Sequence, residues 1–490
     1  MLKLHMPGIY KSLRTLLQAL KSGQVSVPQV VEHYYSVIQE NEPNINALIT
    51  IVPKQKALEV AKQQQKQLEQ AKKAGKLTEL FNQSPLLGVP VIHKDMFVTK
   101  GIRTTAGSKV LDNFVPEYDS TVSEKLKKAG AITIAKANQD AWAHGSSGEN
   151  SDYGPTRNPW DLERVPGGSS SGSAAAAALR YAPIVTGTDT GGSIRQPASF
   201  CGVVGLKPTY GRVSRFGIVA MASSLDSIGH FTQDVWSAAY VLGITAGKDP
   251  RDATTADIKV PNYTAVVEEA ENIKTPLKGM KIGVLKEFFD DGVDPRIKDV
   301  VGAVVKELEK FGATLVDVSI PEVKYGLEIY YIIQPAEVAS NLARYDGVRY
   351  GNPREYFGPE AKRRIMLGNF ILSDVVVGKP EATSYTQAAK ARALMIKKFN
   401  EAYKKVDVLV GPVSPIMPFK LGEKVDDPLQ MYMSDLLTVS INIVGNPGLA
   451  LNAGWVDNLP VGVQIIAPNF EEARLFRVGR VIEMISGGLP

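Results

Sequence analysis

Short apolar runs that alternate with segments of helical periodicity are the main pattern in this chain of 490 residues. Apolar residues recur at helical spacing over residues 9–40, with a break near 22–27, and again over 53–75. Runs typical of strands follow at 88–93, 131–135, 184–188, 203–206, 280–285, 313–318, 406–410 and 461–466. This alternation predicts an α/β fold in which helices cover a largely buried sheet.

The length permits two or three domains, but we expect one large body. Residues 1–75 are interpreted as a helical region packed on the core, and residues 76–490 as the core itself. Residues 345–385 hold several Gly and Pro with few strand signals, which predicts a loop-rich insertion over the site.

Composition excludes several classes of protein. Hydrophobic residues make up 44% of the chain and charged residues 22%, and no apolar run reaches the roughly 18 residues of a membrane helix. A single cysteine, Cys201, rules out an internal disulfide and a cysteine-built zinc site. A net charge of +5 is too mild to indicate nucleic-acid binding by itself. Because residues 1–10 lack an apolar signal core, we expect a cytoplasmic protein without a membrane partner.

Two glycine- and serine-rich segments, residues 166–173 and 187–195, carry the chemistry, together with Lys94 at the end of the run 88–93. Glycine allows backbone amides to approach a ligand closely, as a site for a developing oxyanion requires. The alanine-rich residues 173–180 predict a helix directly after the first segment.

Two common explanations of such segments fail. A phosphate-binding P-loop needs Lys and then Ser or Thr after its last glycine, whereas Gly172 is followed by Ser173 and Ala174. A Ser-His-Asp triad needs a histidine, and none of the five is singled out by its position. Lys94 is the sharper candidate for a base, because it follows an apolar strand that should be buried.

These three segments, with the continuation over residues 196–208, resemble the amidase signature family along nearly the whole chain. The resemblance implies a single large domain with a central mixed β-sheet covered by helices on both faces. It also implies a Ser-cisSer-Lys triad of Ser193 as nucleophile, Ser169 as proton relay after a cis peptide bond, and Lys94 as base. The oxyanion hole would be formed by the amides of Thr190, Gly191, Gly192 and Ser193.

Later landmarks at 330–333, 340–350, 362–368 and 427–435 resemble the A subunits of glutamyl-tRNA(Gln) amidotransferases within that family. That resemblance implies glutamine as the substrate. Arg364 would bind its α-carboxylate and Asp435 its α-ammonium, and Tyr330 would line the pocket. A zwitterionic ligand in a desolvated site requires a partner for each charge.

The implied role is that of the glutaminase in a heterotrimeric ligase of protein biosynthesis. This chain would need no cofactor or metal and would supply ammonia to a B subunit, which uses ATP and Mg²⁺ to convert Glu-tRNA(Gln) to Gln-tRNA(Gln). A small C subunit would hold the other two together, and tRNA would contact mainly the B subunit. Two alternatives stay open: a stand-alone amidase acting on another primary amide, and a catalytically silent assembly subunit.

One segment departs from the family. Where its members carry a tyrosine-rich stretch, residues 374–385 read Asp-Val-Val-Val-Gly-Lys-Pro-Glu-Ala-Thr-Ser-Tyr. We expect this change to affect the roof of the pocket and the contact with the B subunit.

Overall fold

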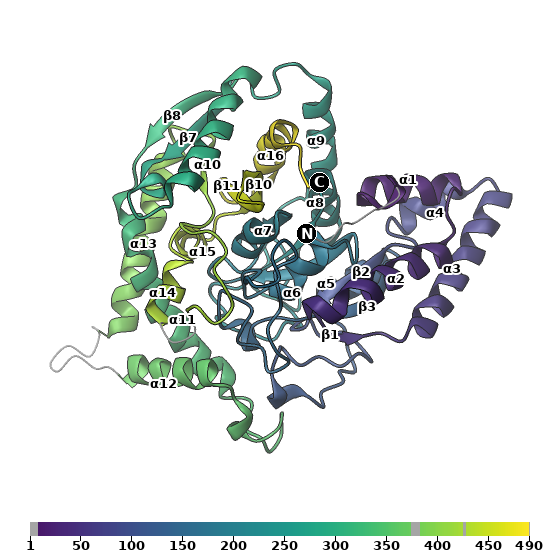
Figure 1. Ribbon diagram of the computed structural model, residues 1–490, viewed down its shortest axis with the longest axis horizontal. Helices are drawn as coiled ribbons and strands as arrows, with labels where there is room; N and C mark the ends of the chain where they lie inside the picture. The colour runs from purple at the N-terminus through teal and green to yellow at the C-terminus, as the bar shows by residue number, and fades with distance from the viewer. Residues whose placement is uncertain (1–7, 374–382, 425–427, 490) are drawn as a thin grey trace.

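An eleven-stranded sheet organises the computed structural model, which describes residues 8–373, 383–424 and 428–489 (Figure 1). The strand order is β1-β3-β2-β4-β6-β5-β10-β11-β9-β7-β8. The strands are β1 (Leu48–Ile51), β2 (Pro90–Lys94), β3 (Ile132–Ala137), β4 (Ile184–Asp189), β5 (Val204–Lys207), β6 (Ser227–Thr232), β7 (Lys281–Leu285), β8 (Thr314–Val318), β9 (Val408–Pro412), β10 (Gly448–Val456) and β11 (Leu459–Ile466).

The sheet is mixed, as expected. Strand β2 runs parallel to β3 and β4, and β7 runs parallel to β8 and β9. The strands between these two parallel groups pair antiparallel. The main apolar core runs along the sheet from the first helices of the chain to the last one, and a small second cluster consists of Val165, Phe200, Phe419 and Met431.

Helices cover both faces of the sheet, as two neighbouring residues of β10 demonstrate. Successive strand residues point to opposite faces. A Cβ on Gly448 would lie 3.0 Å from Arg195 in α7 (Arg195–Cys201), whereas the side chain of Leu449 lies against Gly479 in α16 (Glu472–Ser486). The prediction of a central mixed sheet between helical layers is therefore confirmed.

The other helices also pack around the sheet. In Figure 1 the first four gather beside β1–β3, and α11–α13 lie at the opposite side of the molecule. They are α1 (Leu13–Ser22), α2 (Val27–Ile45), α3 (Lys54–Lys73), α4 (Leu77–Gln83), α5 (Thr121–Lys128), α6 (Ser171–Ala178), α8 (Val235–Thr245), α9 (Tyr263–Asn272), α10 (Pro295–Glu307), α11 (Gly326–Leu342), α12 (Pro359–Ser373), α13 (Ser384–Ala402), α14 (Pro428–Met433) and α15 (Val439–Val444).

The break expected near residues 22–27 separates α1 from α2. Gly23 ends α1 in the left-handed region at φ 78°, and the Ser26 side chain caps the first turn of α2. Each helix start carries a reciprocal capping box, at Ser12 and at Ser26. Local capping chemistry therefore sets these boundaries.

The structure differs from the expected loop-rich insertion over 345–385. Residues 345–358 consist mainly of turns and one short 3-10 helix, but residues 359–373 form the regular helix α12. Tight packing against α11 explains the helix: a Cβ on Gly368 would lie 2.0 Å from the carbonyl oxygen of Pro335. Most of the atypical segment 374–385 lies outside the described residues.

Candidate functional site

Lys94 lies at the carboxyl end of β2 and is fully buried. Its Nζ donates to Ser169 Oγ at 2.8 Å and to Thr188 Oγ1 at 2.8 Å. Burial lowers the pKa of Lys94 to about 7, although the carboxylates of Asp140, Asp189 and Asp226 act in the opposite direction. Near neutral pH a large fraction of this amine is therefore uncharged and able to accept a proton.

Two other lysines are also fully buried, but their surroundings differ. Lys136 lies 3.5 Å from the Asp95 carboxylate, and Lys207 donates to the carbonyls of Pro208 and Asn446. Burial lowers both pKa values, to about 8 for Lys136 and about 7 for Lys207. Of the three, Lys94 is the one that contacts a serine hydroxyl.

The loop that carries Ser169 leaves no room for a side chain at position 168. The Gly168–Ser169 peptide bond is cis, as expected. A Cβ on Gly168 would lie 2.1 Å from Asp140 Oδ2, and its amide donates to Gln196 Oε1 at 3.0 Å. The Ser169 carbonyl accepts a hydrogen bond from the Asp140 amide at 3.1 Å. Asp140 therefore holds Ser169 in place, a role that the sequence did not reveal.

Ser193 lies on the loop between β4 and α7, which one carboxylate organises. The Asp189 carboxylate accepts hydrogen bonds from the backbone amides of Gly192, Ile194 and Arg195 at 2.9, 3.2 and 3.3 Å. The Ser193 carbonyl accepts from the Ser170 amide at 3.3 Å, so the two serine loops are bonded to each other.

The Ser193 side chain is 8% exposed, and its hydroxyl forms no hydrogen bond with the residues that the structure describes. The structure thus joins Lys94 directly to Ser169 and holds Ser193 beside them through the backbone. Hydrogen bonds between catalytic groups are often long before substrate binds and tighten in the complex.

The four amides expected to bind an oxyanion are not equivalent. The Gly192 amide is already bonded to Asp189, which removes it from the expected set. Within the described ranges, the amides of Thr190, Gly191 and Ser193 have no hydrogen-bonding partner. A Cβ on Gly191 would lie 2.8 Å from the Tyr330 hydroxyl, so this glycine keeps the loop open toward α11. Three of the four amides are therefore without a protein partner in the described ranges and are available to a ligand.

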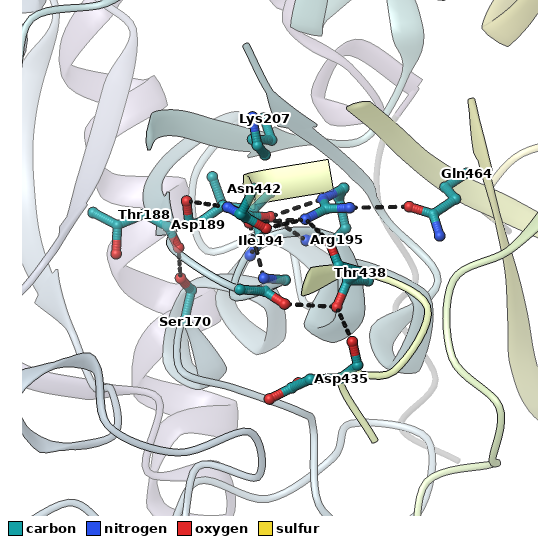
Figure 2. A network of polar contacts seen from close by, with 12 residues as sticks. Ser170, Thr188, Asp189, Ile194, Arg195, Lys207, Asp435, Thr438, Asn442 and Gln464 are labelled. Atoms are coloured by element: carbon teal, nitrogen blue, oxygen red, sulfur yellow. Dashed lines mark hydrogen bonds and ion pairs between the residues drawn. The ribbon is translucent and has the colours of Figure 1, made fainter. Parts of the chain in front are cut away.

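A buried polar network ties the Ser193 loop to the end of the chain (Figure 2). Arg195 pairs with both oxygens of Asp189 at 3.0 Å and donates to Asn442 Oδ1, Gln464 Oε1 and the Thr438 carbonyl. Burial alone would raise the pKa of Asp189, but the Arg195 guanidinium lowers it to about 2. The loop therefore rests on a permanently charged pair.

Arg364 of α12 is 3% exposed and lies among polar and aromatic groups. Its Nε donates to Glu360 Oε1 at 2.7 Å, and its Nη1 donates to Gln334 Oε1 at 2.8 Å. The rings of Tyr331 and Tyr432 lie 5.5 and 5.7 Å from the guanidinium. Because a guanidinium carries several N–H groups on three nitrogens, these two bonds leave donors of Arg364 for a ligand.

Asp435 is buried at the start of the turn before α15, and its Oδ2 accepts from Ser146 Oγ at 2.6 Å. Burial raises its pKa to about 7, against the opposing effect of the Ser146 hydrogen bond and the Arg364 charge. A ligand ammonium would favour the charged carboxylate. Tyr330 of α11 is buried and lies against the Gly191 loop, since a Cβ on Gly191 would lie 2.8 Å from the Tyr330 hydroxyl. Burial raises the pKa of Tyr330, and the charges of Arg364 and Asp435 also act on it.

The open space near these groups is small. A cavity of 30 Å³ lies against Ser146, Glu360, Arg364 and Tyr432, which is room for no more than a few water molecules. A larger cavity of 470 Å³ lies beside Trp160 and Arg296 and contains none of the candidate residues. The smaller cavity is lined by polar and charged side chains, so we identify the candidate site by these residues and not by the size of the cavity. Its lining must move to admit an amino acid.

Several functional candidates escaped the sequence interpretation: Asp140, Asp189, Arg195, Gln334 and Glu360. Asp140 follows strand β3 by three residues, a position at which a polar group commonly enters a site, so a signal existed. Gln334 and Glu360 lie on helices and meet Arg364 only through tertiary packing.

Among the described residues, no cluster of three or more His, Cys, Asp or Glu could hold a metal ion. No helix in the described parts of the chain is long and apolar enough to span a membrane.

A buried lysine bonded to a serine lies beside a second serine loop with unpaired amides, and a mixed α/β sheet carries both; these are the groups that serine-dependent amide hydrolysis would require. Residues 29–476 match the Amidase family model. The chain belongs to the amidase family.

Relatives in that family narrow the comparison. The chain is 46% identical over 492 residues to the A subunit of glutamyl-tRNA(Gln) amidotransferase from Heliobacterium modesticaldum, covering 97% of each chain. It is 48% identical over 490 residues to the protein of the same name from Geobacillus kaustophilus, covering 96% of each. The crystal structure of the Thermotoga maritima protein of that name superposes with a TM-score of 0.81 at 37% identity, covering 99% of this chain and 98% of the other.

Proposed function

We propose that this chain is the glutamine-hydrolysing subunit of a tRNA-dependent amidotransferase, with Ser193 as nucleophile, Ser169 as relay and Lys94 as base. One observation carries the chemistry. The buried Lys94 amine lies 2.8 Å from Ser169 Oγ, in surroundings that lower its pKa to about 7. The near full-length similarity to amidotransferase A subunits supports the choice of substrate.

The reaction begins with proton transfer along the triad. Ser193 Oγ attacks the side-chain carboxamide carbon of glutamine, while its proton passes to Ser169 Oγ and the Ser169 proton passes to Lys94 Nζ. The negative charge on the substrate oxygen is stabilised by the amides of Thr190, Gly191 and Ser193. These donors are the expected oxyanion hole without Gly192, whose amide is bonded to Asp189.

The tetrahedral intermediate collapses by breaking its carbon–nitrogen bond. The proton held on Lys94 returns through Ser169 to the leaving nitrogen, so ammonia departs and Ser193 carries a glutamyl ester. A water molecule then attacks the ester and loses its proton along the same path. Glutamate is released, and the three residues regain their starting protonation states.

The other end of glutamine would be bound by charge. The N–H groups of Arg364 that Glu360 and Gln334 do not use are available to a carboxylate, and Asp435 can pair with the ammonium. Tyr330 lies against the Gly191 loop, and the charges of Arg364 and Asp435 both act on its hydroxyl, so we expect Tyr330 to line a pocket that binds a linear amino acid at both ends.

The remainder of the role follows from the resemblance to A subunits. Ammonia would pass to a B subunit that uses ATP and Mg²⁺ to amidate Glu-tRNA(Gln), in a cytoplasmic heterotrimer completed by a C subunit. The expected contact of residues 374–385 with the B subunit stays a prediction, because residues 374–382 lie outside the described part of the chain.

The test is Ser193→Ala in the complex assembled with its partners. Glutamine-dependent amidation should be abolished, while amidation driven by added ammonium salt should persist, since only the ammonia source is removed. Loss of both activities would contradict the role of Ser193.

Two further measurements separate the alternatives. Rapid hydrolysis of amides unrelated to amino acids by the isolated chain would favour a stand-alone amidase. Absence of a covalent adduct at Ser193 with an amide-directed electrophile would favour a silent assembly subunit.

A further inference from the structure

The glutamine Gln334 lies where α11 and α12 approach most closely. The absence of a side chain at Gly368 lets α12 approach the Pro335 carbonyl, because a Cβ there would lie 2.0 Å from that oxygen. Arg364 precedes Gly368 by one helical turn and therefore lies on the same face of α12. The close approach of the two helices consequently brings Arg364 into contact with Gln334, which precedes Pro335 in α11.

Only one of the two polar atoms of the Gln334 carboxamide forms a hydrogen bond with the described residues. Its Oε1 accepts from Arg364 Nη1 at 2.8 Å, and the side chain is completely buried. Its Nε2 has no hydrogen-bonding partner within the part of the chain that the structure describes. Because a buried amide donor without an acceptor is unfavourable, this atom calls for a partner that the folded chain itself does not supply.

The position of Gln334 directs that donor toward the candidate site. Gln334 and Tyr330 are four residues apart on α11 and so share one face of the helix. Tyr330 contacts the Gly191 loop, and the Tyr331 ring lies over the Arg364 guanidinium. Gln334 Nε2 therefore belongs to the carboxamide that binds the guanidinium, on the helix face that also carries Tyr330, whose hydroxyl lies against the Gly191 loop.

Further unpaired groups lie in the same region. The Tyr331 hydroxyl and both ring nitrogens of His144 are buried and have no hydrogen-bonding partner among the described residues. Burial, and next the charge of Arg364, lowers the pKa of His144, so its imidazole is neutral. Polar atoms left without protein partners around one guanidinium indicate a site for a polar ligand.

We propose that Gln334 determines substrate specificity: its carbonyl fixes the Arg364 guanidinium, and its amide nitrogen donates a second hydrogen bond to the substrate carboxylate that Arg364 binds. This inference rests on the proposed function and deepens it. A donor at this point favours an oxygen acceptor and disfavours an amide NH₂. The substrate class is therefore primary amides that also carry a free carboxylate.

The test compares glutamine with 4-aminobutanamide, which is glutamine without its α-carboxylate. In the assembled complex, Gln334→Ala should raise KM for glutamine about 10- to 100-fold, the usual effect of removing a hydrogen bond to a charged group. It should leave kcat, and both constants for 4-aminobutanamide, within about twofold of wild type. Gln334→Glu should raise KM for glutamine further, because it places a second negative charge beside the carboxylate.

The exposed Gln387 on α13 provides the matched control, and Gln387→Ala should change neither substrate. Equal losses on both substrates, or an unchanged KM for glutamine in both Gln334 variants, would overturn the inference. A wild-type complex that hydrolyses 4-aminobutanamide but not glutamine would instead refute the proposed function, so the two failures are distinguishable.

Discussion

The acid limb of the pH–rate profile tests the Lys94 environment most directly. A pKa of about 7, compared with 10.5 for a free lysine, corresponds to roughly 5 kcal/mol in favour of the neutral amine. Since the neutral form accepts the proton, kcat for glutamine should fall about tenfold per pH unit below pH 7 and level off above it. We expect kcat/KM to fall more steeply, because Asp435, whose pKa is also about 7, then loses the charge that pairs with the substrate ammonium.

Thr188→Val sharpens this prediction. Thr188 Oγ1 accepts from Lys94 Nζ at 2.8 Å, and an acceptor stabilises the ammonium more than the amine. Hydrogen bonds to charged groups contribute about 1 kcal/mol more than neutral ones, so valine should lower the pKa of Lys94 by somewhat less than one unit. The acid limb should move to lower pH by that amount, with the plateau rate near pH 8.5 little changed.

The assay follows ammonia release from pH 5.5 to 9 at constant ionic strength. A profile that is flat to pH 5.5 in the wild type would remove Lys94 as the base. A limb that moves to higher pH in Thr188→Val would refute the hydrogen-bond argument.

Three further predictions concern residues that the structure places at the two ends of the site. Lys94→Met should abolish glutaminase activity yet raise the melting temperature at pH 7, because folding no longer requires a lysine to lose its proton. This gain in melting temperature should shrink as the pH approaches 10.5, where the lysine of the unfolded chain also loses its proton. A melting temperature below that of the wild type at pH 7 would contradict the prediction. Gly168→Ala should destabilise the fold by about 1–3 kcal/mol in denaturant unfolding, since its Cβ would meet Asp140, and a neutral effect would contradict this contact. Arg364→Ala should raise KM for glutamine far more than KM for 4-aminobutanamide, and equal effects would remove Arg364 from the pocket.

The positions of Lys94, Ser169 and Ser193 in the fold could be predicted from sequence because each lies in a local segment with a clear pattern. Lys94 ends an apolar strand, and Ser169 and Ser193 lie in glycine-rich loops that enter α6 and α7. Each of these features depends on neighbours in the chain, which a reader of the sequence can see.

The partners of Arg364 could not be predicted in the same way. Gln334 and Glu360 meet it through the packing of α11 on α12 and through a helical turn, and a residue type alone does not disclose such contacts. The helix α12 itself escaped prediction because Gly and Pro flank it and Gly368 interrupts its periodicity, although that glycine permits the close helix contact.

Strands β6 and β10 were missed for a related reason. Strand β6 is buried throughout and β10 over its first six residues, yet Gly, Ala, Asn or His interrupt their runs of strand-forming residues. At Gly229 of β6 a Cβ would lie 1.9 Å from the Leu206 carbonyl oxygen, so close backbone approach selects the residue. Their pairing partners, rather than intrinsic preference, make them strands.

The bridge from Arg195 to Thr438 has a consequence for how such enzymes can diversify. Arg195 follows Ser193 by two residues, and Thr438 follows Asp435 by three; Thr438 also donates to the Gly191 carbonyl at 2.6 Å. A mutation that shifts the turn at Asp435 would therefore move the Ser193 loop as well. New substrate preferences should arise more readily from mutations in α11 and α12, which adjoin the pocket but do not take part in the hydrogen bonds between Arg195 and Thr438.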